Sequence, residues 1–163
     1  MKQTVSILFA FLLCIPAWAL SDIKPVHLRC NYKINPFIDG QSPKLSWELV
    51  STRYSQVQTA YQVMVASSQA LLDKGVPDIW NSGRITGSQT NQVAYKGKPL
   101  ISARVYYWKV RSWDKDQNPG QWSAVASWET GLFDKSEWKA EWIGLELDSL
   151  NINKEYHLPP RLI

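Results

Sequence analysis

The stretch RVYYWKVRSWD, Arg104–Asp114, places four aromatic rings among eleven residues and alternates two kinds of side chain. One side of an extended chain would carry Tyr106, Trp108, Val110 and Ser112. The other side would carry two charged residues, Lys109 and Arg111. Because successive side chains of a strand point to opposite faces, this pattern predicts a β-strand whose uncharged side faces a hydrophobic core.

The residues around this strand predict further strands with short connections between them. Polar residues at 115–121 form a turn. A short helix over 67–75 is predicted from Ser67 or Ser68 as its cap and Gly75 at its end. Other strands are predicted over residues 43–49, 59–67, 79–85, 91–100 and 122–131. Such spacing is typical of an all-β fold, and we predict an antiparallel β-sandwich of about seven strands over residues 21–131.

The first nineteen residues have the features of an export signal. Lys2 gives a positive start, an apolar run spans Val5–Ile15, and Ala17–Ala19 matches the small–x–small pattern of a signal peptidase site. The apolar run is too short to span a membrane as a helix. We therefore predict that residues 1–19 are a signal peptide and that the protein is exported, to the periplasm or outside the cell.

Loss of this leader changes the cysteine count and the charge. Cys14 leaves with it, so Cys30 has no disulfide partner in the mature chain and is predicted to be a small buried hydrophobic residue. The formal net charge falls from +4 to +3 because Lys2 is lost, and lysine and arginine form no run. This balance gives no support for nucleic acid as a partner.

Residue types that carry catalysis are sparse. The two histidines, His27 and His157, lie in no metal-binding spacing, and no cofactor-binding motif is present, so no metal and no cofactor are predicted. Two carboxylate pairs could in principle serve glycoside hydrolysis, namely Asp114 with Asp116 and Asp134 with Glu137. Acids at such positions usually stabilise turns and helix starts, and we interpret both pairs in this way.

The nine tryptophans suit either a core or a sugar-stacking surface. Trp113, Trp122 and Trp128 are candidates for an exposed face that contacts carbohydrate. The alternative is structural: Trp122 stacks on Lys109 or Arg111 of the neighbouring strand. Four residues are predicted to share the core, namely Trp47, Tyr61, Tyr106 and Trp108.

Six segments taken together resemble one known family. They are LSWEL (45–49), QTAYQVMVAS (58–67), DIWNSGRI (78–85), YKGKPLISARVYYWKVRSWD (95–114), GQWSAVASWETGL (120–132) and EWKAEWIG (137–144). In this order they are similar to the N-terminal immunoglobulin/fibronectin type III-like domain of bacterial α-L-rhamnosidases. The resemblance implies a fibronectin type III-like sandwich in which Leu100 and Tyr106 have the spacing of a tyrosine corner.

The resemblance also implies what this chain does not contain. Rhamnosidases of this kind hydrolyse terminal α-L-rhamnose with two carboxylates in a large (α/α)-barrel far downstream, and 163 residues do not include that barrel. No catalytic residue is therefore assigned, and the chain is expected to be inactive alone, as a truncated gene product or a fragment. Residues 132–163 are expected to be a linker and the incomplete start of a following β-rich domain.

Three functions remain open from the sequence. The first is an accessory domain of a secreted rhamnosidase, whose partners would be the absent catalytic domains. The second is a free-standing carbohydrate-binding module for rhamnose-containing glycans. The third is a generic interaction domain of an exported protein.

Overall fold

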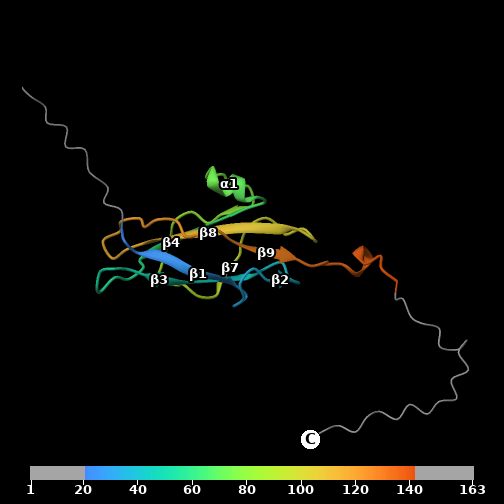
Figure 1. Ribbon diagram of the computed structural model, residues 1–163, viewed down its shortest axis with the longest axis horizontal. Helices are drawn as coiled ribbons and strands as arrows, with labels where there is room; N and C mark the ends of the chain where they lie inside the picture. The colour runs from blue at the N-terminus through green and yellow to red at the C-terminus, as the bar shows by residue number, and fades with distance from the viewer. Residues whose placement is uncertain (1–20, 142–163) are drawn as a thin grey trace, which may run out of the picture. The chain divides into compact units, whose positions relative to one another are not determined.

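The computed structural model describes residues 21–141 (Figure 1). The predicted signal peptide and His157 lie outside the described residues. Residues 21–133 fold as one unit with nine strands and one short α-helix. The strands are β1 (Lys24–Cys30), β2 (Phe37–Ile38), β3 (Lys44–Val50), β4 (Ala60–Ala66), β5 (Trp80–Asn81), β6 (Ile85–Thr86), β7 (Val93–Ala94), β8 (Val105–Trp113) and β9 (Ala126–Thr130). The helix is α1 (Gln69–Asp73).

These strands form two sheets that pack face to face. One sheet has the order β1-β3-β7, and the other has the order β2-β9-β8-β4-β5, with β6 also paired to β4. Trp47 of the first sheet contacts Tyr61 of the second, with ring centroids 5.3 Å apart. Side chains of both sheets share one hydrophobic core, so the predicted β-sandwich is the fold of the chain.

Two details differ from the predicted sandwich. The described residues hold nine strands rather than about seven, because the strand predicted over 79–85 is divided into β5 and β6 and because the two-residue strand β2 was not predicted. Gly83, with φ of +63°, separates β5 from β6. In addition, β2 pairs with β9 in parallel, whereas every other strand pair is antiparallel within residues 21–133.

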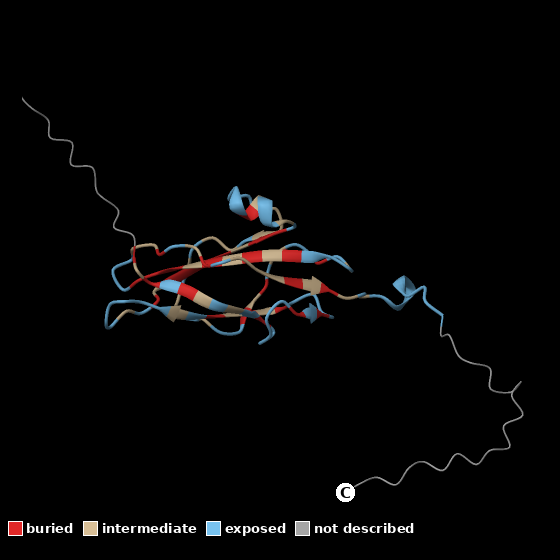
Figure 2. Ribbon diagram, viewed as in Figure 1, coloured by how far each residue is buried: buried red, intermediate tan, exposed pale blue. Residues whose placement is uncertain are grey.

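The strand β8 lies at the centre of the larger sheet. It pairs with β4 from Trp113 opposite Ala60 to Tyr107 opposite Ala66, and with β9 on its other side. Figure 2 shows buried and half-buried positions alternating along it. The uncharged side of β8 faces the core, as its alternation predicts.

A cluster of aromatic rings fills the core beneath β8. Trp128 of β9 stacks on Tyr106 with centroids 5.8 Å apart, and its ring lies 6.5 Å from that of Trp108. Both tryptophans are buried. Because large aromatic side chains bury the most area per residue, this cluster is the main hydrophobic contribution of the larger sheet.

The loop before β8 is held by a tyrosine. The Tyr106 hydroxyl accepts a hydrogen bond of 2.8 Å from the Ile101 backbone N–H. Leu100 is buried, and the Gln41 side chain both accepts from its N–H and donates to its carbonyl. This is the arrangement of a tyrosine corner, which ties the loop to the strand that follows it.

The helix α1 contacts β4 and β8 (Figure 1). It begins after Ser68, whose hydroxyl accepts from the Leu71 N–H, and Gly75 follows its end with a φ of +72°. The predicted cap and end of this helix are therefore confirmed.

Residues from 134 onward form a second unit, of which 134–141 are described. It contains one turn of 3₁₀ helix, η1 (Lys135–Glu137). No helix within residues 21–141 is long and apolar enough to cross a membrane.

Candidate functional site

The outer side of β8 carries the cationic residues that alternation predicts. Lys109 and Arg111 are half-buried there, between core-facing neighbours that are fully covered. Trp122, from the segment before β9, lies within reach of both cations. This face of the sheet therefore carries two of the candidate sugar-binding tryptophans, Trp113 and Trp122.

Cations and rings alternate across this face, and we call the set Arg84, Lys109, Arg111, Trp113 and Trp122 the ladder. The Arg111 guanidinium carbon lies 4.7 Å from the Trp113 ring centroid and 4.8 Å from that of Trp122. Arg84 lies 5.2 Å from the Trp113 centroid, and the Lys109 ammonium lies 5.2 Å from that of Trp122. Each distance is within the range of a cation–π interaction.

Hydrogen bonds hold the cations of the ladder in place. Arg111 Nε donates to Gln62 Oε1 at 3.0 Å, and Gln62 Nε2 donates in turn to Asn81 Oδ1 at 2.8 Å. Lys109 Nζ donates to the Leu72 carbonyl at the end of α1, at 2.6 Å. Burial lowers the pKa of Arg111 below its ordinary value, yet arginine stays charged at any physiological pH. The cations therefore have fixed positions over the rings.

The ladder leaves its two rings little free surface. Trp113 has a cation within cation–π range at two places, Arg84 and Arg111, and only 7% of the residue is exposed. Trp122 is half-buried and has Lys109 and Arg111 as its cations. Sugar stacking needs an open aromatic face, and cations lie over both rings. The ladder therefore has the geometry of a structural contact across the sheet.

The expectation that Trp128 lies on an exposed face is wrong. It is 1% exposed and belongs to the core cluster. The reason is its register: Trp128 lies directly opposite Tyr106 where β9 pairs with β8, and directly paired residues share one face of a sheet. Trp113, also expected on an exposed face, is likewise buried because its cations cover it.

The two carboxylate pairs have structural partners. Asp114 is completely buried, and its Oδ1 accepts from the N–H groups of Asp116 and Asn118, each at 2.9 Å. Burial alone would raise the pKa of Asp114, but these hydrogen bonds together with the Ser21 hydroxyl lower it overall. In the second unit, Asp134 and Glu137 form the capping box of η1. Asp114, Asp134 and Glu137 thus stabilise local structure in the way the sequence suggested, whereas the Asp116 carboxylate accepts from the Lys115 ammonium.

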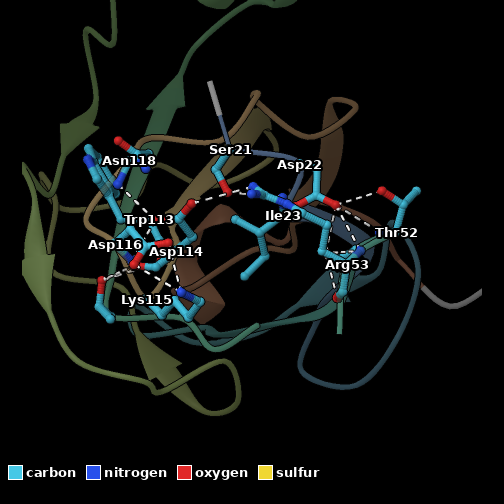
Figure 3. Close-up of polar contacts among 12 residues, drawn as sticks. Ser21, Asp22, Ile23, Thr52, Arg53, Trp113, Asp114, Lys115, Asp116 and Asn118 are labelled. Carbon is cyan, nitrogen blue, oxygen red and sulfur yellow. Dashed lines mark hydrogen bonds and ion pairs between the residues drawn. The ribbon is translucent and has the colours of Figure 1, made fainter. Parts of the chain in front are cut away.

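A polar clamp that the sequence did not predict joins three distant segments (Figure 3). The Asp22 carboxylate accepts from the side chains of Ser51, Thr52 and Arg53 and from the N–H groups of Thr52 and Arg53. These bonds, led by that of the Thr52 hydroxyl, hold the pKa of Asp22 well below its usual range. The Arg53 guanidinium also lies 3.9 Å from Asp114. Asp22 is 29–31 residues away in sequence from Ser51, Thr52 and Arg53, so no local pattern marks the clamp.

A glycine allows the first described segment to pass over the end of β8. A Cβ atom at Gly120 would lie 2.2 Å from the Ile23 carbonyl oxygen, which no side chain permits. The Ser21 N–H donates to the Pro119 carbonyl at 3.1 Å beside this contact. The turn at residues 115–121 therefore also contacts the first described residues of the domain.

The remaining reactive residues have structural surroundings. Cys30 is buried, as predicted, and burial raises the pKa of its thiol to about 12. His27 lies exposed at a bulge of β1, where its Nδ1 is 2.8 Å from Glu48 Oε2. Across residues 21–141, no group of three or more His, Cys, Asp or Glu side chains could hold a metal ion.

Comparison with known proteins gives consistent matches. A family model described as the Rha78A-like, N-terminal immunoglobulin domain matches residues 25–134. An α-L-rhamnosidase of Formosa agariphila is 38% identical over 144 residues, which cover 87% of this chain and 15% of that protein. An α-L-rhamnosidase of Streptomyces avermitilis is 44% identical over 106 residues, which cover 65% of this chain and 10% of that protein.

A solved structure matches as well. The crystal structure of the Streptomyces avermitilis α-L-rhamnosidase complexed with L-rhamnose superposes with a TM-score of 0.73 and 38% identity, over 77% of this chain and 12% of that one. The chain thus spans only about a tenth to a seventh of the length of these relatives.

Proposed function

The chain belongs to the family of Rha78A-like N-terminal immunoglobulin domains, and from this premise we propose that it is a non-catalytic accessory domain of an α-L-rhamnosidase-type glycoside hydrolase. One observation carries the proposal: the match covers most of this chain but only 10–15% of the α-L-rhamnosidases it resembles. The parent reaction would be the hydrolysis of terminal α-L-rhamnose, performed by the parts of those enzymes that lie outside the match.

The geometry of the carboxylates supports a non-catalytic role. Glycoside hydrolysis requires two carboxyl groups that face one substrate, with the pKa of the acid raised. Asp114 is instead buried in a turn with a lowered pKa, and the Asp134 carboxylate, also with a lowered pKa, caps η1. Neither Asp114 nor Asp134 therefore offers a proton donor near neutral pH.

An assay with an aryl α-L-rhamnoside tests this proposal. The purified 163-residue chain should release no aryl alcohol above the buffer rate, while a complete α-L-rhamnosidase such as that of Streptomyces avermitilis hydrolyses it under the same conditions. Saturable hydrolysis by the chain, surviving repeated purification, would show that it has an active site of its own and overturn the proposal.

A calorimetric titration with rhamnose-containing oligosaccharides separates the accessory domain from a free-standing carbohydrate-binding module. We expect no saturable heat, because cations already lie over the Trp113 and Trp122 rings. Binding that is abolished by Trp122→Ala and retained by Trp138→Ala, an exposed tryptophan of the second unit, would instead favour the sugar-binding module.

We further propose that the chain is exported and that residues 132–163 link the sandwich to a following domain. The support for export is the leader pattern of residues 1–19, and the support for the boundary is the separation of the chain into units at Phe133 and Asp134. Mass spectrometry of the protein from its native host should give a mature form that begins at Leu20. A cell-associated form that retains Met1 would contradict export.

A further inference from the structure

A row of side chains crosses the end of the larger sheet from which the chain leaves the domain. Val105 of β8 lies opposite Glu129 of β9, and Glu129 lies opposite Phe37 of β2. Directly paired residues share a face, so these three side chains form one row. The next residues along each strand, Tyr106, Trp128 and Ile38, are buried, which places the row on the outer face. Phe37 is 71% exposed and Val105 is 40% exposed.

The tyrosine corner adds Ile101 to this surface in a fixed position. Ile101 is 63% exposed, yet its N–H donates to the Tyr106 hydroxyl and its carbonyl accepts from the Thr130 hydroxyl at 2.6 Å. Its exposure therefore does not come from a frayed loop. An apolar side chain held mostly in water contributes little to the stability of the isolated domain, and contiguous groups of such side chains mark contact surfaces.

A hollow of about 260 Å³ borders this surface, because Ile101 and Val105 also line the hollow. Its lining consists of Ser67, Ile79, Ile101, Arg104, Val105 and Tyr106. Pockets that hold small ligands usually measure about 300–1,000 Å³, and this one lies below that range. A mostly apolar lining with one arginine suits a protruding side chain of a partner protein better than a sugar.

The chain leaves the sandwich beside this surface (Figure 1). After β9, the Gly131 N–H donates to the Ile38 carbonyl and the Phe133 N–H donates to the Ser102 hydroxyl of the corner loop. Leu132, between them, is exposed. A domain tethered through residue 133 would therefore meet the exposed row at a high effective concentration.

We propose that the exit face, formed by Phe37, Ile101, Arg104, Val105, Glu129 and Leu132, docks the domain that follows the immunoglobulin domain in α-L-rhamnosidases. This inference rests on the proposed function, because the relatives extend far beyond the matched residues 25–134. Interfaces between domains of one chain bury about 600–1,500 Å² and combine an apolar centre with polar groups. Arg104 and Glu129 supply the polar groups here.

Hydrogen–deuterium exchange tests the docking directly. A chimera carries residues 21–134 of this chain in place of the matching domain of the Streptomyces avermitilis α-L-rhamnosidase, and it is compared with the 163-residue chain alone. Amides of residues 101–106 and 129–133 should exchange at least about tenfold more slowly in the chimera. Amides of residues 51–57, in the loop at the opposite end of β4, should exchange equally in both proteins.

Substitutions on the exit face provide a second measurement. Ile101→Asp and Phe37→Asp should leave the melting temperature of the 163-residue chain nearly unchanged, because both side chains are already exposed. In the chimera each should lower the melting temperature or split the transition, since a charge would face the apolar centre of the interface. Tyr54→Asp is the matched control, an exposed aromatic residue in the loop at the opposite end, and should change neither protein.

The outcomes separate the two proposals. Equal exchange at the exit face in a folded and active chimera would overturn the docking face and leave the accessory role intact. A chimera that yields no folded rhamnosidase would count against the proposed function. Protection of the exit face in the chain alone that grows with protein concentration would identify a second copy as the occupant and overturn the inference.

Discussion

The two faces of β8 carry aromatic rings in similar number but in opposite surroundings. On the inner face, Tyr106 and Trp108 pack against Trp128, ring against ring. On the outer face, Trp113 packs against Arg84 and Arg111. A ring excludes water in both cases, but its partner differs: apolar carbon inside and a fixed cation outside. An aromatic-rich strand therefore says little about ligand binding until the partners of each ring are known.

This contrast predicts different energies for the two faces. Inner rings are stabilised by the area they remove from water, whereas outer rings depend on electrostatic attraction to a partly solvated cation. The first contribution is large and is not screened by salt, and the second is small and weakened by salt.

Removing an inner ring should have the largest effect. Trp108→Ala should lower the free energy of unfolding by about 3–5 kcal/mol, because it leaves a cavity in a fully buried cluster. Urea unfolding followed by circular dichroism measures this loss. Trp108→Phe, which keeps a ring in place, should cost clearly less. A loss below about 1 kcal/mol for the alanine variant would mean that the inner cluster is not the core of the domain.

Removing an outer ring should have an intermediate effect. Trp122→Ala deletes the stacking partner of Lys109 and Arg111 and should lower the free energy of unfolding by about 1–2 kcal/mol. The same urea titration applies, with Trp138→Ala as a control that should change stability by less than about 0.5 kcal/mol because that tryptophan is exposed. A loss of free energy as large as that of Trp108→Ala would show that rings on the two faces contribute equally to stability.

The electrostatic origin of the outer contacts can be isolated with a double-mutant cycle. Arg111→Met and Trp122→Ala, combined, should show a coupling free energy of about 0.5–1 kcal/mol, since methionine keeps much of the side-chain volume and removes the charge. The coupling should shrink in about 1 M salt. A coupling that is unchanged by salt would assign the ladder to packing alone.

The smallest effect is the pH dependence of the polar clamp around Asp22, which belongs to neither face of β8. The pKa of Asp22 is lowered in the folded protein, so its contribution is complete above the unfolded pKa of about 3.9 and is lost as the pH falls through the folded value. The difference in melting temperature between wild type and Asp22→Asn should therefore be constant above about pH 5 and shrink in acid. A difference that grows toward low pH would contradict the lowered pKa.

Much of the fold could be predicted because its signals are local. The alternation along β8, the cap at Ser68 and the spacing of Leu100 and Tyr106 each lie within a few residues. The burial of Trp128 could not be predicted in this way. Its segment alternates too, but alternation alone does not say which side faces the core, and the answer comes from its pairing with Tyr106.

The candidate site shows the same limit. Lys109, Arg111 and Trp122 could be grouped in advance because the sequence predicts a strand over 122–131 that neighbours the strand carrying the two cations. Arg84 could not, because it comes from the loop between β5 and β6 and meets Trp113 only in the folded sheet. Nothing near Asp22 in the sequence indicates that Ser51, Thr52 and Arg53 will surround its carboxylate.

The sequence by itself determined the class of fold, the family to which the chain belongs, and the shortage of catalytic residue types. These depend on periodicity and on motifs that are continuous along the chain. Only the tertiary structure decided which tryptophans are core, that the outer rings lie under cations, and that Phe37, Val105 and Ile101 share one exposed face. The physical reason is that burial and pairing are set by residues far apart in sequence, which meet only when the two sheets close on their core.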